Sequence, residues 1–205
     1  TCQNTEIVRT LEIAKMLLKA GVSKTENSKE YVHEIGERFE FIRPDFNKSM
    51  VDEVSDALNE LYVLFDVEPV PHRVVYDGKS KIMVKTDTWQ KQHNELWNML
   101  VPGRGVANTV QGEVIRIVGK VLHEILDNGG MNWDEEYRKM LRALEEYFYM
   151  ADGMEAKLVE EACNLTKIVS SRSDEKVLYR LNELAVKWVL ANPEPLALGK
   201  VEYSR

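Results

Sequence analysis

Apolar residues recur every three or four positions along most of the chain, which is the spacing of one face of an α-helix. The first such run extends from Thr5 to Ala20 and ends at Gly21, and glycine is common just beyond a helix. The second run ends before Pro44, because proline disfavours helical backbone in the residue ahead of it. The full pattern predicts helices over residues 5–20, 28–42, 49–65, 89–100, 108–127 and 132–148, and an antiparallel helical pair that contains 158–169 and 177–188.

The helical period is broken once, between residues 66 and 86. Two prolines fall there, and two short β-type runs then flank Asp77-Gly-Lys-Ser80. This pattern predicts a short β-hairpin inserted at 66–86. The whole chain, 1–205, is therefore predicted to be a single all-α domain, a bundle of seven or eight helices, and prolines mark residues 193–205 as a loose tail.

The amino-acid composition indicates which kinds of partner and which cellular compartment to expect. The chain carries a formal net charge of -7, which opposes broad binding to nucleic acid. Its two cysteines, Cys2 and Cys163, are too few for a disulfide-stapled secreted domain and favour a reducing, cytoplasmic location. No run of apolar residues is long enough to span a membrane, and charges interrupt the start of the chain, so neither a membrane anchor nor a signal peptide is expected.

Two glycines lie inside the central predicted helix, Gly112 and Gly119, although each costs about 1 kcal/mol relative to alanine. Because they are seven residues apart, they share one side of the helix. One interpretation is a smooth groove lined by Arg116 and His123. The alternative is a close crossing of two helices, with Arg116 paired to Glu113 at the surface.

The loop before this helix, Pro102-Gly-Arg-Gly105, is the first candidate binding site. A helix start offers free backbone N–H groups to an anion, and Arg104 adds a charged fork. Asn108 is predicted to cap the helix, with Gln111 completing a pair like a capping box. The loop lacks the spacing of a nucleotide-binding motif, so a plain turn between two helices is the alternative.

The segment after the helix, Asn128-Gly-Gly-Met-Asn-Trp-Asp134, is the second candidate. Trp133 lies beside polar residues, and tryptophan is enriched at binding surfaces. Asn132 is also a predicted helix N-cap, so an ordinary connection between helices is the alternative.

Charged residues on the central helix raise a different hypothesis. Glu113, Glu124 and Asp127 could hold Mg²⁺ with its waters, as the paired acidic helices of all-α nucleotide pyrophosphatases do. The stripe they share with Arg116 and Lys120 is more typical of a helix face that points to solvent. No complete metal site or cofactor motif is present in the sequence, so neither a metal nor a cofactor is predicted.

The run from Leu96 to Gly103, the run Asn108-Thr-Val-Gln-Gly-Glu-Val-Ile-Arg116 and the segment 128–134 together resemble a family of bacterial helical proteins. The resemblance covers about forty residues. It implies that this segment carries the function, and it implies no activity, cofactor or partner.

The sequence thus predicts a non-enzymatic helical protein that binds a partner protein or a small anionic ligand, with a homo-oligomer as a further expectation. A Mg²⁺-dependent hydrolase of nucleotides or other phosphate compounds is the alternative. The predicted binding residues are Arg104, Asn108, Gln111, Arg116, Asn132 and Trp133.

Overall fold

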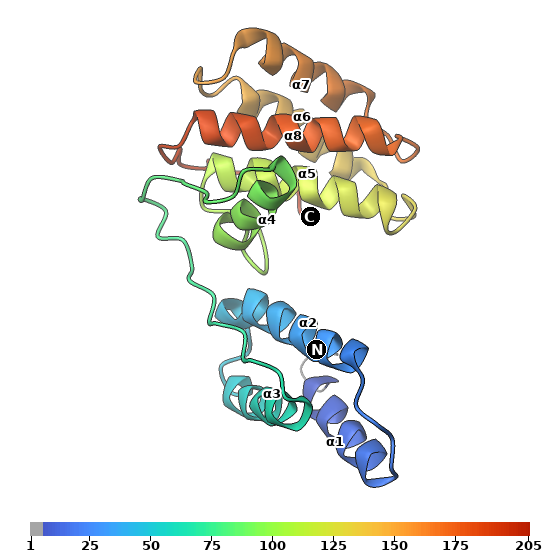
Figure 1. Ribbon diagram of the computed structural model, residues 1–205. Coiled ribbons are helices and arrows are strands. Elements are labelled where there is room, and N and C mark those ends of the chain that lie inside the picture. The colour runs from blue at the N-terminus through green and yellow to red at the C-terminus, as the bar shows by residue number, and fades with distance from the viewer. Residues whose placement is uncertain (1–5) are drawn as a thin grey trace. The chain divides into compact units, whose positions relative to one another are not determined.

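A computed structural model describes residues 6–205, which form eight α-helices and confirm the all-α class (Figure 1). The predicted helix start at Thr5 lies outside the described residues. Where the sequence predicts one domain, the chain divides into two compact units, one ending at Val74 and the other running from Val75 to Arg205. In the described part, none of the helices combines the length and the apolar character needed to cross a membrane.

The first unit consists of three α-helices and one turn of 3-10 helix. These are α1 (Glu6–Lys19), α2 (Glu26–Ile42), the turn η1 (Arg43–Asp45) and α3 (Val51–Phe65). The apolar face of α3 packs against both α1 and α2, and Leu61 is fully buried in this core. Phe39 and Phe46 meet edge to face there, 5.2 Å apart between ring centroids.

A buried carboxylate ties the segment after α3 to the first unit. Glu40 on α2 accepts hydrogen bonds from Arg43 and interacts with the His72 ring at 3.1 Å. Burial opposes ionisation of Glu40, but the hydrogen bonds from Arg43 and His72 outweigh burial and lower its pKa. An ionised, hydrogen-bonded Glu40 therefore holds the chain at residue 72.

The second unit is built around one buried helix. It contains α4 (Trp89–Leu100), α5 (Val110–Leu126), α6 (Glu135–Phe148), α7 (Ala156–Ile168) and α8 (Glu175–Ala191). α5 packs against α4, α6 and α8, while α7 covers α6 and α8 on the far side from α5 (Figure 1). Most of the α5 side chains are buried, so the central position predicted from its apolar circumference is confirmed within this unit.

Helix starts differ from the sequence prediction by one or two residues. Thr109, rather than Asn108, caps α5 by accepting a hydrogen bond from the Gly112 backbone N–H at 3.1 Å. Asp134, rather than Asn132, caps α6. In both places several residues that can act as caps are adjacent, so the sequence alone does not distinguish them.

The predicted β-hairpin at 66–86 is wrong. The turn forms, since the Asp77 side chain accepts hydrogen bonds from the backbone N–H groups of Lys79 and Ser80, both at 2.8 Å. The flanking runs, however, form no strands. Ile82 instead buries its side chain and donates its N–H to the Pro193 carbonyl at 2.9 Å. An isolated two-stranded hairpin is marginal in water, and here Ile82 bonds to the segment after α8 instead of pairing with a second strand.

The expectation of a loose tail at 193–205 is also wrong. Leu196 accepts a hydrogen bond from the Val110 N–H at 2.9 Å, and the Tyr203 side chain is buried. The Gln111 side chain donates to the carbonyls of Asn192 and Glu194 and accepts from the Leu196 N–H. Residues 192–205, called here the C-terminal segment, therefore lie along α5 as part of the second unit.

Candidate functional site

The loop 128–134 is organised around the carboxylate of Glu124. Asn132 donates to it from both its backbone N–H (2.6 Å) and its side chain (3.1 Å), and the Asn128 side chain donates at 3.1 Å. Burial of Glu124 opposes its ionisation, but these hydrogen bonds prevail and lower its pKa. Glu124 therefore acts as an anchor for the loop that precedes Trp133.

Gly130 brings this loop against the segment that joins α7 to α8. Its φ is +70°, and a Cβ there would lie 2.7 Å from the Ser171 carbonyl oxygen. A larger residue would thus be both strained and in collision with Ser171. The glycine is required for the two loops to meet beside Trp133.

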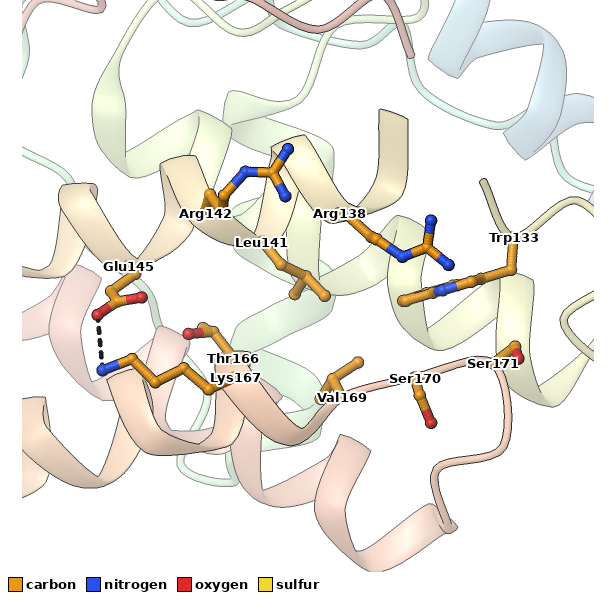
Figure 2. Close-up of a pocket in the computed structure, with 10 residues that line it drawn as sticks. All are labelled: Trp133, Arg138, Leu141, Arg142, Glu145, Thr166, Lys167, Val169, Ser170 and Ser171. Atoms are coloured by element: carbon orange, nitrogen blue, oxygen red, sulfur yellow. Dashed lines mark ion pairs between the residues drawn. The ribbon is translucent and has the colours of Figure 1, made fainter. Parts of the chain in front are cut away.

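A cavity of about 340 Å³ opens between α6 and the end of α7. Figure 2 shows Trp133 and Arg138 on one side of it, with Val169, Ser170 and Ser171 across from them. This cavity is called here the Trp133 pocket. Its lining residues are Trp133, Arg138, Leu141, Arg142, Glu145, Thr166, Lys167, Val169, Ser170 and Ser171.

The Trp133 indole is held in a fixed plane. It stacks on the Tyr137 ring with centroids 5.1 Å apart and planes inclined by 10°. Tyr137 is buried, and its hydroxyl lies 3.5 Å from the Glu124 carboxylate. The same carboxylate therefore anchors the loop before Trp133 and the aromatic ring behind it.

Cationic side chains dominate the charge of the Trp133 pocket. Its lining contains three cations and one carboxylate, in a chain whose net charge is -7. Arg138 and Arg142 share a single carboxylate, that of Glu135, at 3.1 and 2.7 Å. Lys167 pairs with Glu145 at 2.9 Å, and this hydrogen bond raises the lysine pKa (Figure 2). Lys167 therefore stays charged at neutral pH.

A second cavity, of about 450 Å³, lies within the first unit between α1 and α2. Its lining is mainly apolar, with Ile35, Phe39 and Ile42 among the side chains, and it includes two arginines. It shares no residue with the segments 102–105 and 128–134 that the sequence marks as candidate sites. The Trp133 pocket, by contrast, is built by the predicted loop 128–134.

The structure does not bring the six predicted binding residues onto one surface. Arg104 and Asn108 are exposed near the start of α5, whereas Trp133 follows its other end, about 25 Å away along the helix. Gln111 is buried and holds the C-terminal segment. Asn132 is exposed but uses its backbone and side-chain donors on Glu124. Of the six, Trp133 lines the pocket.

Arg116 lies inside the second unit rather than at a surface. Its guanidinium donates to both oxygens of Glu113, at 2.6 and 2.8 Å, and both side chains are at most 1% exposed. Tyr203 donates its hydroxyl to Glu113 at 2.7 Å and lies 3.1 Å from the Tyr147 hydroxyl. Burial, together with these neighbours, raises the Tyr203 pKa, so the phenol stays protonated and remains a donor.

The interpretation of the charged α5 stripe as a solvated face is therefore wrong for most of its length. Glu113, Arg116 and Glu124 are buried, and Asp127 alone among its three acids is exposed, where it pairs with His123. The C-terminal segment and α6 cover the stripe. Buried polar side chains can hydrogen-bond to polar groups of a neighbouring segment. The stripe they form along the helix then has the same sequence pattern as a stripe that faces solvent.

The interior glycines of α5 mark a close helix crossing. A Cβ on Gly119 would overlap the Trp97 ring of α4, and a Cβ on Gly112 would lie 2.9 Å from that of Ala107. His93 stacks near Trp97 in the same contact, and burial lowers its pKa to about 4. The side of α5 that carries Gly119 is therefore filled by α4 and does not form an open groove.

The three carboxylates of the hydrolase hypothesis do not converge. Glu113 and Glu124 are about three turns apart on α5, roughly 16 Å along its axis, and each is engaged by donors of the chain. Over residues 6–205, the His, Cys, Asp and Glu side chains form no group of three or more that could hold a metal ion.

Sequence reasoning missed the cations of the pocket. Glu135, Arg138 and Arg142 are spaced by three and four residues, so their common helix face could have been recognised. Lys167 and residues 169–171 join them only because α7 packs on α6, and no local spacing reports that contact.

No family model matches the chain, and no similar protein was found among curated proteins or solved structures. The resemblance of residues 96–134 to a bacterial helical family thus stays a prediction.

Proposed function

We propose that this protein binds a small anionic ligand, with a phosphate or carboxylate group, in the Trp133 pocket. The observation that carries the proposal is a cavity of about 340 Å³ lined by one tryptophan and three cations, Arg138, Arg142 and Lys167. Cavities of roughly 300–1,000 Å³ are typical of small-molecule sites. The chain is acidic overall, so this concentration of positive charge is a local feature.

The arginines retain hydrogen-bonding capacity for a ligand. Each guanidinium has five N–H donors, and the Glu135 carboxylate takes one hydrogen bond from each side chain. Glu135 therefore orients both forks without using up their donors. Planar guanidinium groups match the geometry of carboxylate and phosphate oxygens.

Apolar lining favours a ligand that is more than a simple ion. Leu141 and Val169 are buried beneath the cavity, and the half-buried Trp133 forms one wall. An aromatic wall next to cations suits a planar ring that carries an acidic group. The ring would stack on or beside the indole while the acidic group reaches the arginines and Lys167.

Isothermal titration calorimetry tests this proposal with three probes. AMP and benzoate carry a ring and an anionic group, and inorganic phosphate is an anion without a ring. We expect AMP or benzoate to bind the wild-type protein more tightly than phosphate. The double variant Arg138→Gln/Arg142→Gln should weaken binding at least tenfold, since it removes two charge-assisted contacts.

The matched control is Lys176→Gln/Lys200→Gln, which removes the same charge from two exposed positions outside the pocket. We expect this control to bind like the wild type. The proposal is overturned if no probe binds at millimolar concentration, or if both double variants lose affinity equally.

A further inference from the structure

Three planar groups lie in succession at the back of the Trp133 pocket. Tyr137 stacks against the Trp133 indole at 5.1 Å on one ring face. The guanidinium carbon of Arg205 lies over the Tyr137 ring, 5.0 Å from its centroid. Tyr137 thus contacts both a residue of the pocket wall and one of the C-terminal segment.

Asp134 fixes the guanidinium in that position. One carboxylate oxygen accepts from the backbone N–H groups of Glu136 and Tyr137 and so caps α6, at 3.0 and 3.3 Å. The other oxygen accepts from two nitrogens of Arg205, at 2.6 and 3.2 Å. A single carboxylate therefore joins the start of α6, directly after Trp133, to the C-terminal segment.

The C-terminal segment is itself secured just before Arg205. Ser204 donates its backbone N–H to Glu136 at 2.6 Å, and Tyr203 is buried on Glu113. These contacts hold the backbone before Arg205 in place, so that the Arg205 side chain lies next to Tyr137 instead of extending into solvent. Arg205 does not line the pocket.

We propose that Arg205 is a positioning residue for the Trp133 pocket, acting through Tyr137 to hold the indole in the plane that receives a ligand. The effect on ligand affinity rests on the proposed function, whereas the effect on the indole does not. Attraction between a guanidinium and an aromatic face favours one ring orientation over another. Loss of this preorganisation lowers affinity without removing a ligand contact.

The first experiment needs no ligand. The full chain is labelled with 5-fluorotryptophan, its four ¹⁹F resonances are assigned by single Trp→Phe variants, and Arg205→Ala is compared with the wild type. We expect the Trp133 resonance to move and broaden while those of Trp89, Trp97 and Trp188 stay in place. Lys200→Ala, an exposed position in the same segment, should leave all four unchanged.

Arg205→Lys separates charge from planar stacking. Lysine can keep an ion pair with Asp134 but has no flat group to cover Tyr137, so its Trp133 resonance should lie between those of the wild type and Arg205→Ala. The inference is overturned if the Trp133 resonance of Arg205→Ala coincides with that of the wild type, or if all four resonances shift together.

The second experiment measures affinity for AMP by calorimetry. We expect Arg205→Ala to weaken binding about threefold to tenfold and Lys200→Ala, which removes the same charge, to leave it unchanged. Equal losses in both variants would assign the effect to net charge and contradict positioning. If AMP does not bind the wild type, benzoate replaces it as the probe. If none of AMP, benzoate and phosphate binds, the proposed function fails, and the fluorine spectra still decide the role of Arg205.

Discussion

Gly119 shows how one missing side chain sets the distance between two helices. The space where a Cβ of residue 119 would lie is occupied by the ring of Trp97 on α4. Alanine at this position must push the indole or the helix aside. The glycine therefore persists in a helix interior because packing outweighs its poor helix propensity.

We expect Gly119→Ala to lower the free energy of unfolding by about 1–3 kcal/mol, the range for overpacked cores. Urea unfolding followed by circular dichroism measures the change. Gly199→Ala is the matched control, because a Cβ there meets nothing within 4 Å, and it should leave stability nearly unchanged. A Gly119→Ala variant as stable as this control would show that α4 and α5 do not cross so closely.

His93, packed against the same crossing, makes stability depend on pH. Burial lowers its pKa from 6.5 to about 4, so the unfolded chain binds a proton at a higher pH than the folded one does. As the pH falls from 6.5 towards 4, the free energy of unfolding should decrease by up to about 1.4 kcal/mol per pH unit from this group alone. Above pH 6.5 the contribution is constant.

The comparison of His93→Gln with wild type across this pH range isolates the effect. We expect the variant to have a flatter dependence of the unfolding free energy on pH, and His33→Gln, whose side chain is 51% exposed, to keep the wild-type slope. Parallel curves for His93→Gln and the wild type would argue against a neutral, buried imidazole.

At the scale of elements, the loop between α5 and α6 depends on one carboxylate. Glu124→Gln keeps the shape but removes the charge, and its amide N–H₂ faces the donors of Asn128 and Asn132. We expect a loss of about 1–3 kcal/mol in stability, as for other unsatisfied buried groups. Faster hydrogen exchange should be confined to residues 128–134.

Asp127→Asn is the control for Glu124→Gln, because it removes the same charge three residues further on, at the C-cap of α5, from a side chain that is 64% exposed. We expect its effect to stay within about 0.5 kcal/mol. Similar losses in the two variants would contradict the anchoring role of Glu124.

Sequence periodicity predicts the helices well and their surroundings poorly. The helix at 89–100 is confirmed at both ends, and the apolar circumference of α5 places it correctly inside its unit. The charged stripe from Glu113 to Glu124 gives no sign that it is buried. The C-terminal segment, which covers this stripe, has no helical period of its own. The prediction of a solvent-exposed stripe and the prediction of a loose tail are therefore wrong for the same reason.

The sequence predicts only one part of the candidate pocket, the loop 128–134, because the rest depends on contacts between segments that are distant in the chain. The glycines and asparagines of 128–134 are local signals, and they point to Trp133. The contact of Gly130 with Ser171 and the presence of Arg142 and Lys167 in one pocket lining depend on how α6, α7 and the following loop pack. Long-range contacts of this kind leave no periodic trace in a single sequence.

At the scale of the whole molecule, each unit has its own buried core. Leu61 of α3 packs with side chains between Leu11 and Phe65, all within the first unit, and Leu184 of α8 is fully buried in the second. The boundary between the units has no clear signal in the sequence, because the breakers near 66–86 also fit a hairpin insertion. A linker and an insertion share the same composition of breakers and short extended runs.

Paired core substitutions test this division. Leu61→Ala and Leu184→Ala each remove a fully buried leucine and should each destabilise by about 2–5 kcal/mol. Because each leucine packs within its own unit, we expect Leu61→Ala to speed native-state hydrogen exchange in α1, α2 and α3 and to leave α5 and α8 protected, while Leu184→Ala does the reverse. Mass spectrometry of peptic fragments resolves the two sets of helices. Each variant is the control for the other, and loss of protection throughout residues 6–205 in either one would show a single cooperative core instead of two.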